Sequence, residues 1–327
     1  MARNNIENVS RFRDLDAVCG HPGKMESLRF GMIDGPFRGI PMKAQPAASF
    51  RQWMHRTPDG TRLFVQASEP ADGGLRASIL LTHGMGEHSG RYHHVIRRLN
   101  EAGLRVVTWD LRGHGRSEGR RGDVREYDVL VEDLLEIWSL ARPGPGPIFL
   151  YGHSLGGQIT LNFAVRHHPE AAGLVITSPW LRLAFVPPRW KTSLAWVATH
   201  LWPSFTQDTD MAPGRLSRDL DFLLAMPDQH LVHHRMSARM FQALIKGAQD
   251  AFRNGVRLPY PILLIHGSGD PVTSAGATQH FYDSLESGDK SLVIVPEALH
   301  ETHNDLCRET VLDRITGWLD ARVSAGV

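Results

Sequence analysis

Short apolar runs that alternate with helical stretches limit most strongly what this chain can fold into. Six such runs occur from position 77 onward, at 77–84, 104–110, 147–154, 173–179, 261–267 and 291–297. Runs that are apolar at nearly every position are typical of strands buried on both faces. Strands of this kind that alternate with helices form a mostly parallel sheet with helices on both faces. The sequence therefore predicts an α/β fold.

Two segments outside this alternation predict how the chain begins. Residues 51–68 have the pattern of a β-hairpin, with Pro58-Asp59-Gly60 as its turn. Residues 1–48 show no sustained period, and we interpret them as an N-terminal extension.

The alternation stops between 180 and 258, a stretch that holds four of the eight tryptophans. We interpret it as helices and loops inserted between two strands. The predicted domains are therefore a core of 49–179 and 259–327 and a mainly helical cap of 180–258. A cap in that position would cover the carboxyl ends of the strands, where α/β sheets bind their ligands.

Composition excludes several classes of function. The net charge of +1 provides no strong field for nucleic acid, and no run of about 18 apolar residues is present to span a membrane. The first residues lack the apolar stretch of a signal peptide. The two cysteines, Cys19 and Cys307, are too few for a disulfide framework, so we expect reduced thiols and a cytoplasmic protein.

Ser154 lies in the string Gly-His-Ser-Leu-Gly-Gly at 152–157, directly after an apolar run and before a helical stretch. A serine at a tight strand-to-helix turn is lifted above the sheet, and glycines leave room for such a turn. A free serine hydroxyl is a weak nucleophile, so it needs a histidine base and an acid that orients the histidine. A tight glycine turn with a solvated serine is the alternative reading of the same string.

The two partners are expected after later strands, the acid first and the histidine next. Asp270 follows the run at 261–267, and His300 follows the run at 291–297. Asp270 could instead serve only to form a turn before a proline, and His303 rivals His300 as the base. Because His300 lies closest to the end of its strand, we predict a triad of Ser154, Asp270 and His300.

Transfer of an acyl group also needs donors for the negative oxygen of the tetrahedral intermediate. The backbone N–H of Leu155, which follows the serine, is one candidate, and that of Met85 in the glycine-rich loop after the first apolar run is the other. An ordinary connection between a strand and a helix would also favour glycines in that loop.

Five strings together resemble the monoacylglycerol lipase / lysophospholipase branch of the α/β-hydrolases. They are HGMGEHSGRY (83–92), DLRGHGRSEG (110–119), GHSLGG (152–157), HGSGD (266–270) and the segment around His300. The resemblance covers roughly 50–325. It implies an α/β-hydrolase fold with an inserted cap, and a serine esterase that acts on a single acyl chain with no metal and no cofactor.

The resemblance also implies a polar pocket for the glycerol or other alcohol group of the substrate. In this chain its residues would be Glu87, Arg91, His153 and His303. Glu87 and Arg91 could instead pair with each other and only hold their loop.

Within the cap, the stretch 189–205 has Leu194, Val197 and Leu201 at near-helical spacing, flanked by Trp190 and Trp202. It predicts either a helix that packs on the core or the wall of an apolar tunnel for an acyl chain, with transient membrane or micelle contact. The histidines of 229–236 are interpreted as a solvated helix face rather than as a metal site.

The predicted substrate is thus a single-chain lipid ester, a monoacylglycerol above all. A carboxylesterase of broad specificity and a lysophospholipase are the alternatives within the same chemistry. A ligand-binding protein of this fold that does not catalyse is the alternative from another class.

Overall fold

The computed structural model describes residues 50–71, 74–141, 146–185, 201–209 and 211–325. The predicted extension at 1–48 lies outside these residues, as does most of the tryptophan-rich stretch of the cap, at 186–200. All described residues belong to one unit of the chain, 47–327.

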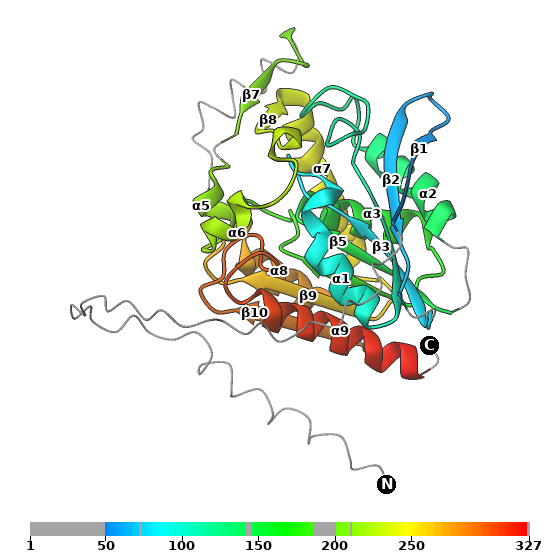
Figure 1. Ribbon diagram of the computed structural model, residues 1–327. Coiled ribbons are helices and arrows are strands. Elements are labelled where there is room, and N and C mark those ends of the chain that lie inside the picture. Colours follow the sequence, from blue (N-terminus) through cyan, green and yellow to red (C-terminus); the bar gives the residue numbers. More distant parts are fainter. Residues whose placement is uncertain (1–49, 72–73, 142–145, 186–200, 210, 326–327) are drawn as a thin grey trace, which may run out of the picture. The chain divides into compact units, whose positions relative to one another are not determined.

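The core of the molecule is an eight-stranded sheet with the strand order β1-β2-β4-β3-β5-β6-β9-β10 (Figure 1). The six strands from β4 to β10 run parallel to one another, whereas β2 pairs antiparallel with β4, and β1 with β2. This confirms the mostly parallel sheet, and each of the six apolar runs forms one of its parallel strands. The strands are β1 (Phe50–Arg56), β2 (Arg62–Ser68), β3 (Ala77–Thr82), β4 (Leu104–Trp109), β5 (Ile148–His153), β6 (Gly173–Thr177), β9 (Ile262–Gly267) and β10 (Lys290–Val295).

The hairpin formed by β1 and β2 has its turn where the sequence predicts it. The N–H of Gly60 donates to the carbonyl of Thr57 at 2.9 Å, and Gly60 has a φ of +89° that side-chain-bearing residues rarely adopt. The sequence predicts strands buried on both faces, but β10 is only half-buried along most of its length. Among the described strands it is the last in the sheet, so one of its edges has no neighbour there.

Helices cover both faces of the sheet, and side chains of successive strand residues point to opposite faces. Leu80 packs in a cluster with helices α2, α3, α7 and α8, whereas its neighbours Ile79 and Leu81 pack with α1 and α9. The last helix, α9, buries an apolar face against the sheet, with Ile315 and Leu319 both 0% exposed. The helices are α1 (His93–Glu101), α2 (Asp128–Ala141), α3 (Leu155–His167), α7 (Ala238–Gly255), α8 (Ala275–Ser284) and α9 (Arg308–Ala325).

The insertion between β6 and β9 is more varied than the sequence predicts. A two-stranded antiparallel ribbon, β7 with β8, accompanies the short helical elements. Figure 1 shows β7 and β8 at the top of the view and α5 and α6 at its left. The elements are β7 (Thr206–Asp208), α5 (Pro213–Leu216), α6 (Leu220–Leu224), η3 (Gln229–Leu231) and β8 (Arg235–Ser237).

Helix α7 falls inside the segment predicted as cap, yet it packs on the core helix α3. Met240 and Leu244 of α7 are fully buried in the same apolar cluster as Ile159 of α3. The amide of Asn162 on α3 donates to the carbonyl of Gly247 at 2.9 Å. Part of the segment that the sequence assigns to the cap is therefore packed against a core helix.

The described ranges were also searched for membrane spans. None of their helices combines the length with the apolar composition that crossing a bilayer requires.

Candidate active site

Ser154 occupies the sharp turn between β5 and α3, with backbone angles φ of 52° and ψ of −115°. A positive φ at a residue other than glycine costs roughly 1–3 kcal/mol, so the surrounding contacts must hold it. The N–H of Ser154 donates to the carbonyl of Thr177 at 2.9 Å, and its carbonyl accepts from the N–H of Trp180 at 3.0 Å. A Cβ on Gly156 would come within 2.2 Å of the Thr82 carbonyl oxygen, which explains a glycine at that position.

The loops after β9 and β10 bring Asp270 and His300 to this serine. The Oγ of Ser154 lies 2.9 Å from Nε2 of His300, and Nδ1 of His300 lies 2.7 Å from Oδ2 of Asp270. His303, the rival for the position of the base, has no hydrogen bond to Ser154. The three residues that the sequence predicts as a triad thus form one continuous hydrogen-bonded chain.

Asp270 is held by donors that keep it ionised. Its Oδ1 accepts from the N–H groups of Val272 and Thr273 at 2.7 and 3.0 Å, and its Oδ2 accepts from the Thr273 hydroxyl at 2.9 Å. Burial works to raise the pKa of Asp270, but His300 and His266 outweigh burial and lower it. In turn, burial lowers the pKa of His300, but the Asp270 carboxylate more than offsets this, and the pKa lies above its usual value.

His266, at the end of β9, is a member of this site that sequence reasoning missed. Its Nε2 lies 3.0 Å from Oδ2 of Asp270, and its Nδ1 lies 2.8 Å from the hydroxyl of Thr278 on α8. The available signal was its position four residues before Asp270 in the string HGSGD. His266 is fully buried, so it holds the Asp270 carboxylate in place without contacting solvent.

The loop after β3 lies directly against the serine. A Cβ on Gly84 would come within 3.2 Å of the Cβ of Ser154, so only glycine lets the loop approach so closely. The half-buried Met85 follows it and lines the cavity beside Ser154. Leu155 is the first residue of α3, and an N–H at that position has no carbonyl one turn earlier to donate to. Both predicted oxyanion donors therefore lie next to Ser154.

Glu87 and Arg91 pair with each other, and a third residue that the sequence did not suggest joins them. Nε of Arg91 lies 3.2 Å from Glu87, and Nη2 of Arg91 lies 2.6 Å from Oε2 of Glu301. Glu87 also accepts from the N–H of Gly84 at 2.6 Å and from the hydroxyl of Tyr92 at 2.7 Å, so it fixes the loop that carries Met85. We call Glu87, Arg91 and Glu301 the acidic cluster.

All three residues of the acidic cluster are almost fully buried, and all three also line the cavity. Glu87 and Arg91 therefore do both things that the sequence left open. They pair and hold their loop, and they also line the cavity. Burial and the nearby Glu301 raise the pKa of Glu87 to about 7.

The remaining two predicted pocket residues differ in their access to the cavity. His153 lines it, with its ring centroid 5.0 Å from that of His300. His303 is 0% exposed, stacks on Tyr92 at 4.9 Å, and is not among the described residues that line the cavity. The structure therefore brings His153, but not His303, to the place where a substrate would lie.

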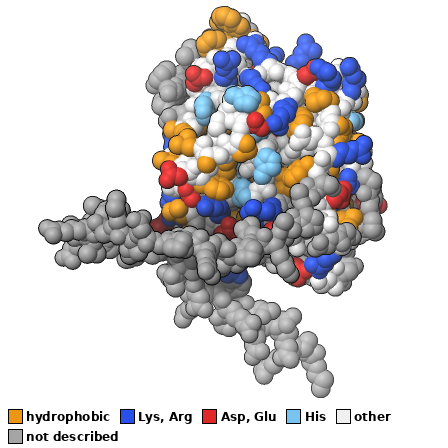
Figure 2. Space-filling view, in the orientation of Figure 1, with side chains coloured by type: hydrophobic (Ala, Val, Ile, Leu, Met, Phe, Trp, Pro, Cys, Tyr) orange, Lys and Arg blue, Asp and Glu red, His pale blue; other side chains and the backbone are white. Residues whose placement is uncertain are grey.

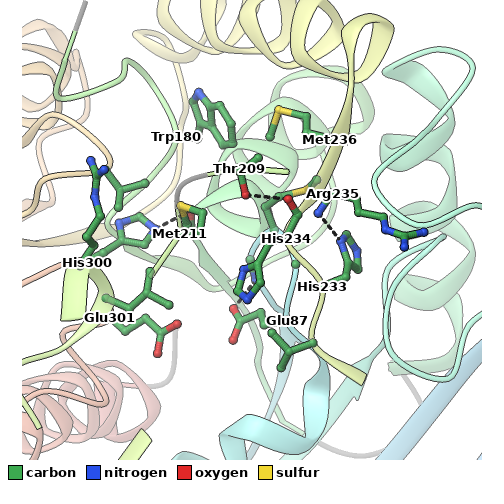
Figure 3. A pocket seen from close by; sticks show the side chains of 18 of the residues that line it. Glu87, Trp180, Thr209, Met211, His233, His234, Arg235, Met236, His300 and Glu301 are labelled. Atoms are coloured by element: carbon green, nitrogen blue, oxygen red, sulfur yellow. Dashed lines mark hydrogen bonds between the residues drawn. The ribbon is translucent and has the colours of Figure 1, made fainter. Parts of the chain in front are cut away.

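Ser154 and His300 open into a cavity of about 580 Å³ between the sheet and the inserted segment (Figure 3). Its wall on the side of the insertion is largely apolar. The apolar side chains of this wall are Trp180, Leu183, Phe185, Met211, Leu216, Val232, Met236 and Phe241. Trp190, Leu194 and Val197, which the sequence assigns to a cap helix or tunnel wall, lie outside the described residues.

The interpretation of 229–236 as a solvated helix face is wrong. Only a short 3₁₀ turn forms there before the chain extends into β8, and His233 and His234 line the cavity (Figure 3). Nowhere in the described ranges do three histidine, cysteine, aspartate or glutamate side chains group as a metal site requires.

Comparison with known proteins places this geometry in a family. Residues 73–307 match the family model described as Serine aminopeptidase, S33. The chain is 31% identical over 263 residues to a monoacylglycerol lipase of Mycolicibacterium smegmatis, covering 80% of this chain and 93% of that protein. It is 34% identical over 251 residues to an uncharacterized abhydrolase domain-containing protein of Dictyostelium discoideum, of which it spans only 26%.

A solved structure leads to the same family. The crystal structure of the monoacylglycerol lipase from Paleococcus ferrophilus superposes with a TM-score of 0.72 at 29% identity, covering 80% of this chain and 99% of that one. The α/β-hydrolase fold is thereby confirmed. The chain belongs to the serine aminopeptidase family of α/β-hydrolases and, within that superfamily, to the monoacylglycerol lipase branch.

Proposed function

We propose that this protein is a serine ester hydrolase that cleaves monoacylglycerols through an acyl-enzyme on Ser154. The hydrogen-bonded chain from Ser154 through His300 to Asp270, at the floor of a largely apolar cavity, is the observation that carries the proposal. The names of the relatives in Mycolicibacterium smegmatis and Paleococcus ferrophilus support the substrate class.

In the acylation step, Nε2 of His300 takes the proton of Ser154 as Oγ attacks the ester carbonyl carbon. The carbonyl oxygen becomes negative in the tetrahedral intermediate, where the N–H groups of Met85 and Leu155 stabilise it. His300 then gives the proton to the departing glycerol oxygen, which breaks the ester bond. Asp270 keeps Nδ1 of His300 protonated and stabilises the imidazolium that forms in between.

Deacylation repeats these steps with water. His300 removes a proton from a water molecule, whose oxygen attacks the acyl-enzyme, and Ser154 recovers its proton as the fatty acid leaves. In this account, the apolar wall of the cavity holds the acyl chain. Glu87, Arg91 and His153 hold the hydroxyl-bearing alcohol group, and no step requires a metal or a cofactor.

The alternatives within the same chemistry are a carboxylesterase of broad specificity and a lysophospholipase. A protein of this fold that only binds its ligand is a third. The continuous hydrogen bonds of the triad favour catalysis over binding alone, because a nucleophile paired with a base has no role in simple binding.

Contact with a membrane or micelle surface through the inserted segment is part of the proposal. Three apolar side chains near β7 are strongly exposed, Leu201 at 81%, Trp202 at 65% and Phe205 at 43%. Figure 2 shows apolar side chains at the tip above β7. Such side chains can partition into the boundary of a bilayer while the enzyme draws in its substrate. A cytoplasmic location stays a prediction.

Removal of any triad side chain tests the site directly. We expect Ser154→Ala, His300→Ala and Asp270→Asn each to lower kcat on a nitrophenyl ester by a factor on the order of 10⁴ or more, because the triad acts as a unit. His280→Ala, at an exposed position on α8, is the matched control and should keep wild-type activity. A nearly inactive His303→Ala combined with an active His300→Ala would contradict the assignment of the base.

The pH dependence follows from the direction of the pKa shift at His300. Only neutral His300 can accept the Ser154 proton, so kcat/KM should rise with pH and level off above the pKa of this histidine. Because Asp270 raises that pKa, the midpoint should lie above about 6.5, the ordinary value for histidine. The measurement is kcat/KM on a neutral ester across this range, and a flat profile between about pH 5 and 8 would exclude a histidine base.

A substrate panel tests the proposed function itself. Each methylene that enters the apolar cavity is worth about 0.8 kcal/mol, or up to about fourfold in kcat/KM, until the cavity is full. Monoacylglycerols of medium to long chain should therefore surpass their short-chain analogues, and they should surpass triacylglycerols, whose extra chains have no room. Hydrolysis of triacylglycerols and monoacylglycerols at equal rates, with no dependence on chain length, would leave only a generic esterase.

A further inference from the structure

The acidic cluster determines the charge that the alcohol group of a substrate meets, if the protein hydrolyses esters as proposed. An arginine beside a nucleophile is usually read as a holder of carboxylate or phosphate. Here Arg91 donates to Glu87 through Nε and to Glu301 through Nη2. With both glutamates ionised the cluster carries a net charge of −1, and with Glu87 protonated it is neutral. In neither state does it offer a net positive charge to an anion.

Glu301 is the residue that keeps the acidic cluster from carrying a net positive charge. Without Glu301, Arg91 would face Glu87 alone, and the pair would be neutral or positive. Glu301 follows His300 directly in the chain, and its N–H donates to the carbonyl of Leu216 at 2.8 Å. The side chain of Glu301 is 5% exposed, so its charge acts across a short distance with little water in between.

The hydrogen bonds of Glu301 leave one oxygen available. Arg91 and the amide of Asn304 both donate to Oε2, each at 2.6 Å, and no donor among the described residues reaches Oε1. Figure 3 shows the carboxylates of Glu301 and Glu87 on the same side of the cavity. An ionised carboxylate only accepts hydrogen bonds, so it can bind a substrate hydroxyl but repels a phosphate or carboxylate oxygen.

We propose that Glu301 makes the alcohol end of this cavity selective for neutral, hydroxyl-bearing groups and against anionic ones. Two further arginines line the cavity outside the acidic cluster. Arg215 donates to the carbonyl of Pro271 at 3.0 Å and lies over the ring of Phe185. Arg235 belongs to β8, across the cavity from Glu301 (Figure 3). The printed hydrogen bonds to the carboxylate of Glu301 come from Arg91 and Asn304, so Arg91 is the arginine whose charge Glu301 balances at the alcohol end.

The test compares two pairs of esters with the same dodecanoyl chain. The first pair is dodecanoyl glycerol and dodecanoyl glycerol phosphate. The second is a phenyl dodecanoate with a neutral hydroxymethyl group and one with a carboxylate. For each pair we expect the wild type to favour the neutral ester by about thirtyfold or more in kcat/KM, since juxtaposed like charges cost several kcal/mol.

The informative variant is Glu301→Gln, which keeps the shape of the side chain and one oxygen for Arg91 and Asn304. We expect the ratio of kcat/KM for the neutral ester to that for the anionic ester to fall about tenfold. Hydrolysis of the neutral hydroxymethylphenyl ester by the same variant shows that its triad still works. Glu297→Gln removes the same charge from the same segment, where the side chain is 73% exposed and outside the cavity, and it should leave the preference unchanged. If Glu301→Gln does not fold, Glu301→Ser replaces it, and we expect the same narrowing of the preference for the neutral ester.

The two pairs separate this inference from the proposed function. One outcome is that the enzyme prefers the neutral phenyl ester in a way that depends on Glu301, but does not hydrolyse dodecanoyl glycerol. This outcome would overturn the monoacylglycerol assignment and retain the role of Glu301. Rapid hydrolysis of dodecanoyl glycerol, with a charge preference that is absent or identical in wild type and variants, would overturn the role of Glu301 alone.

Discussion

The backbone of Ser154 is the constraint on which the rest of this site depends. Its positive φ points the hydroxyl away from the sheet and toward His300, and this conformation is unfavourable by itself. It persists because Thr177 and Trp180 bond its N–H and carbonyl, and because glycines at 152 and 156 leave space for the crossing chains. The parallel strands on either side fix those contacts, so the fold supplies the geometry that the chemistry needs.

The acidic cluster extends this constraint to the cavity. Glu87 ties the loop that carries Met85, and Arg91 ties that loop to the segment that carries His300. One buried charge network thus connects the oxyanion side of the site with the base. Breaking one partner of such a network leaves an uncompensated charge in the interior, which is strongly destabilising. The same residues that shape the alcohol end are therefore also structural, which explains why the two readings of Glu87 and Arg91 are not exclusive.

The sequence predicts much of this arrangement because periodicity and strand ends carry it. Buried strands leave continuous apolar runs, and parallel strands bring their carboxyl ends together, so Asp270 and His300 could be inferred from order alone. Glu301 could not be inferred, because nothing local shows that a side chain will meet a partner 210 residues away. For His266 the only local signal was its position four residues before Asp270. The sequence also could not show where α7 packs, because its apolar face fits a cap helix or a core helix equally well. The structure shows that it packs on α3. For His303 the resemblance predicted a substrate contact, but the fold buries the ring against Tyr92.

The central claim is that Ser154 carries the acyl group, and trapping that intermediate tests it most directly. The enzyme is mixed with a nitrophenyl dodecanoate, quenched in acid within the first turnovers, and examined by mass spectrometry of the intact chain and of its peptides. The account predicts a mass gain of one dodecanoyl group on the peptide that contains Ser154, and no gain in Ser154→Ala. An acyl group on another side chain, or hydrolysis that continues at the wild-type rate in Ser154→Ala, would contradict it.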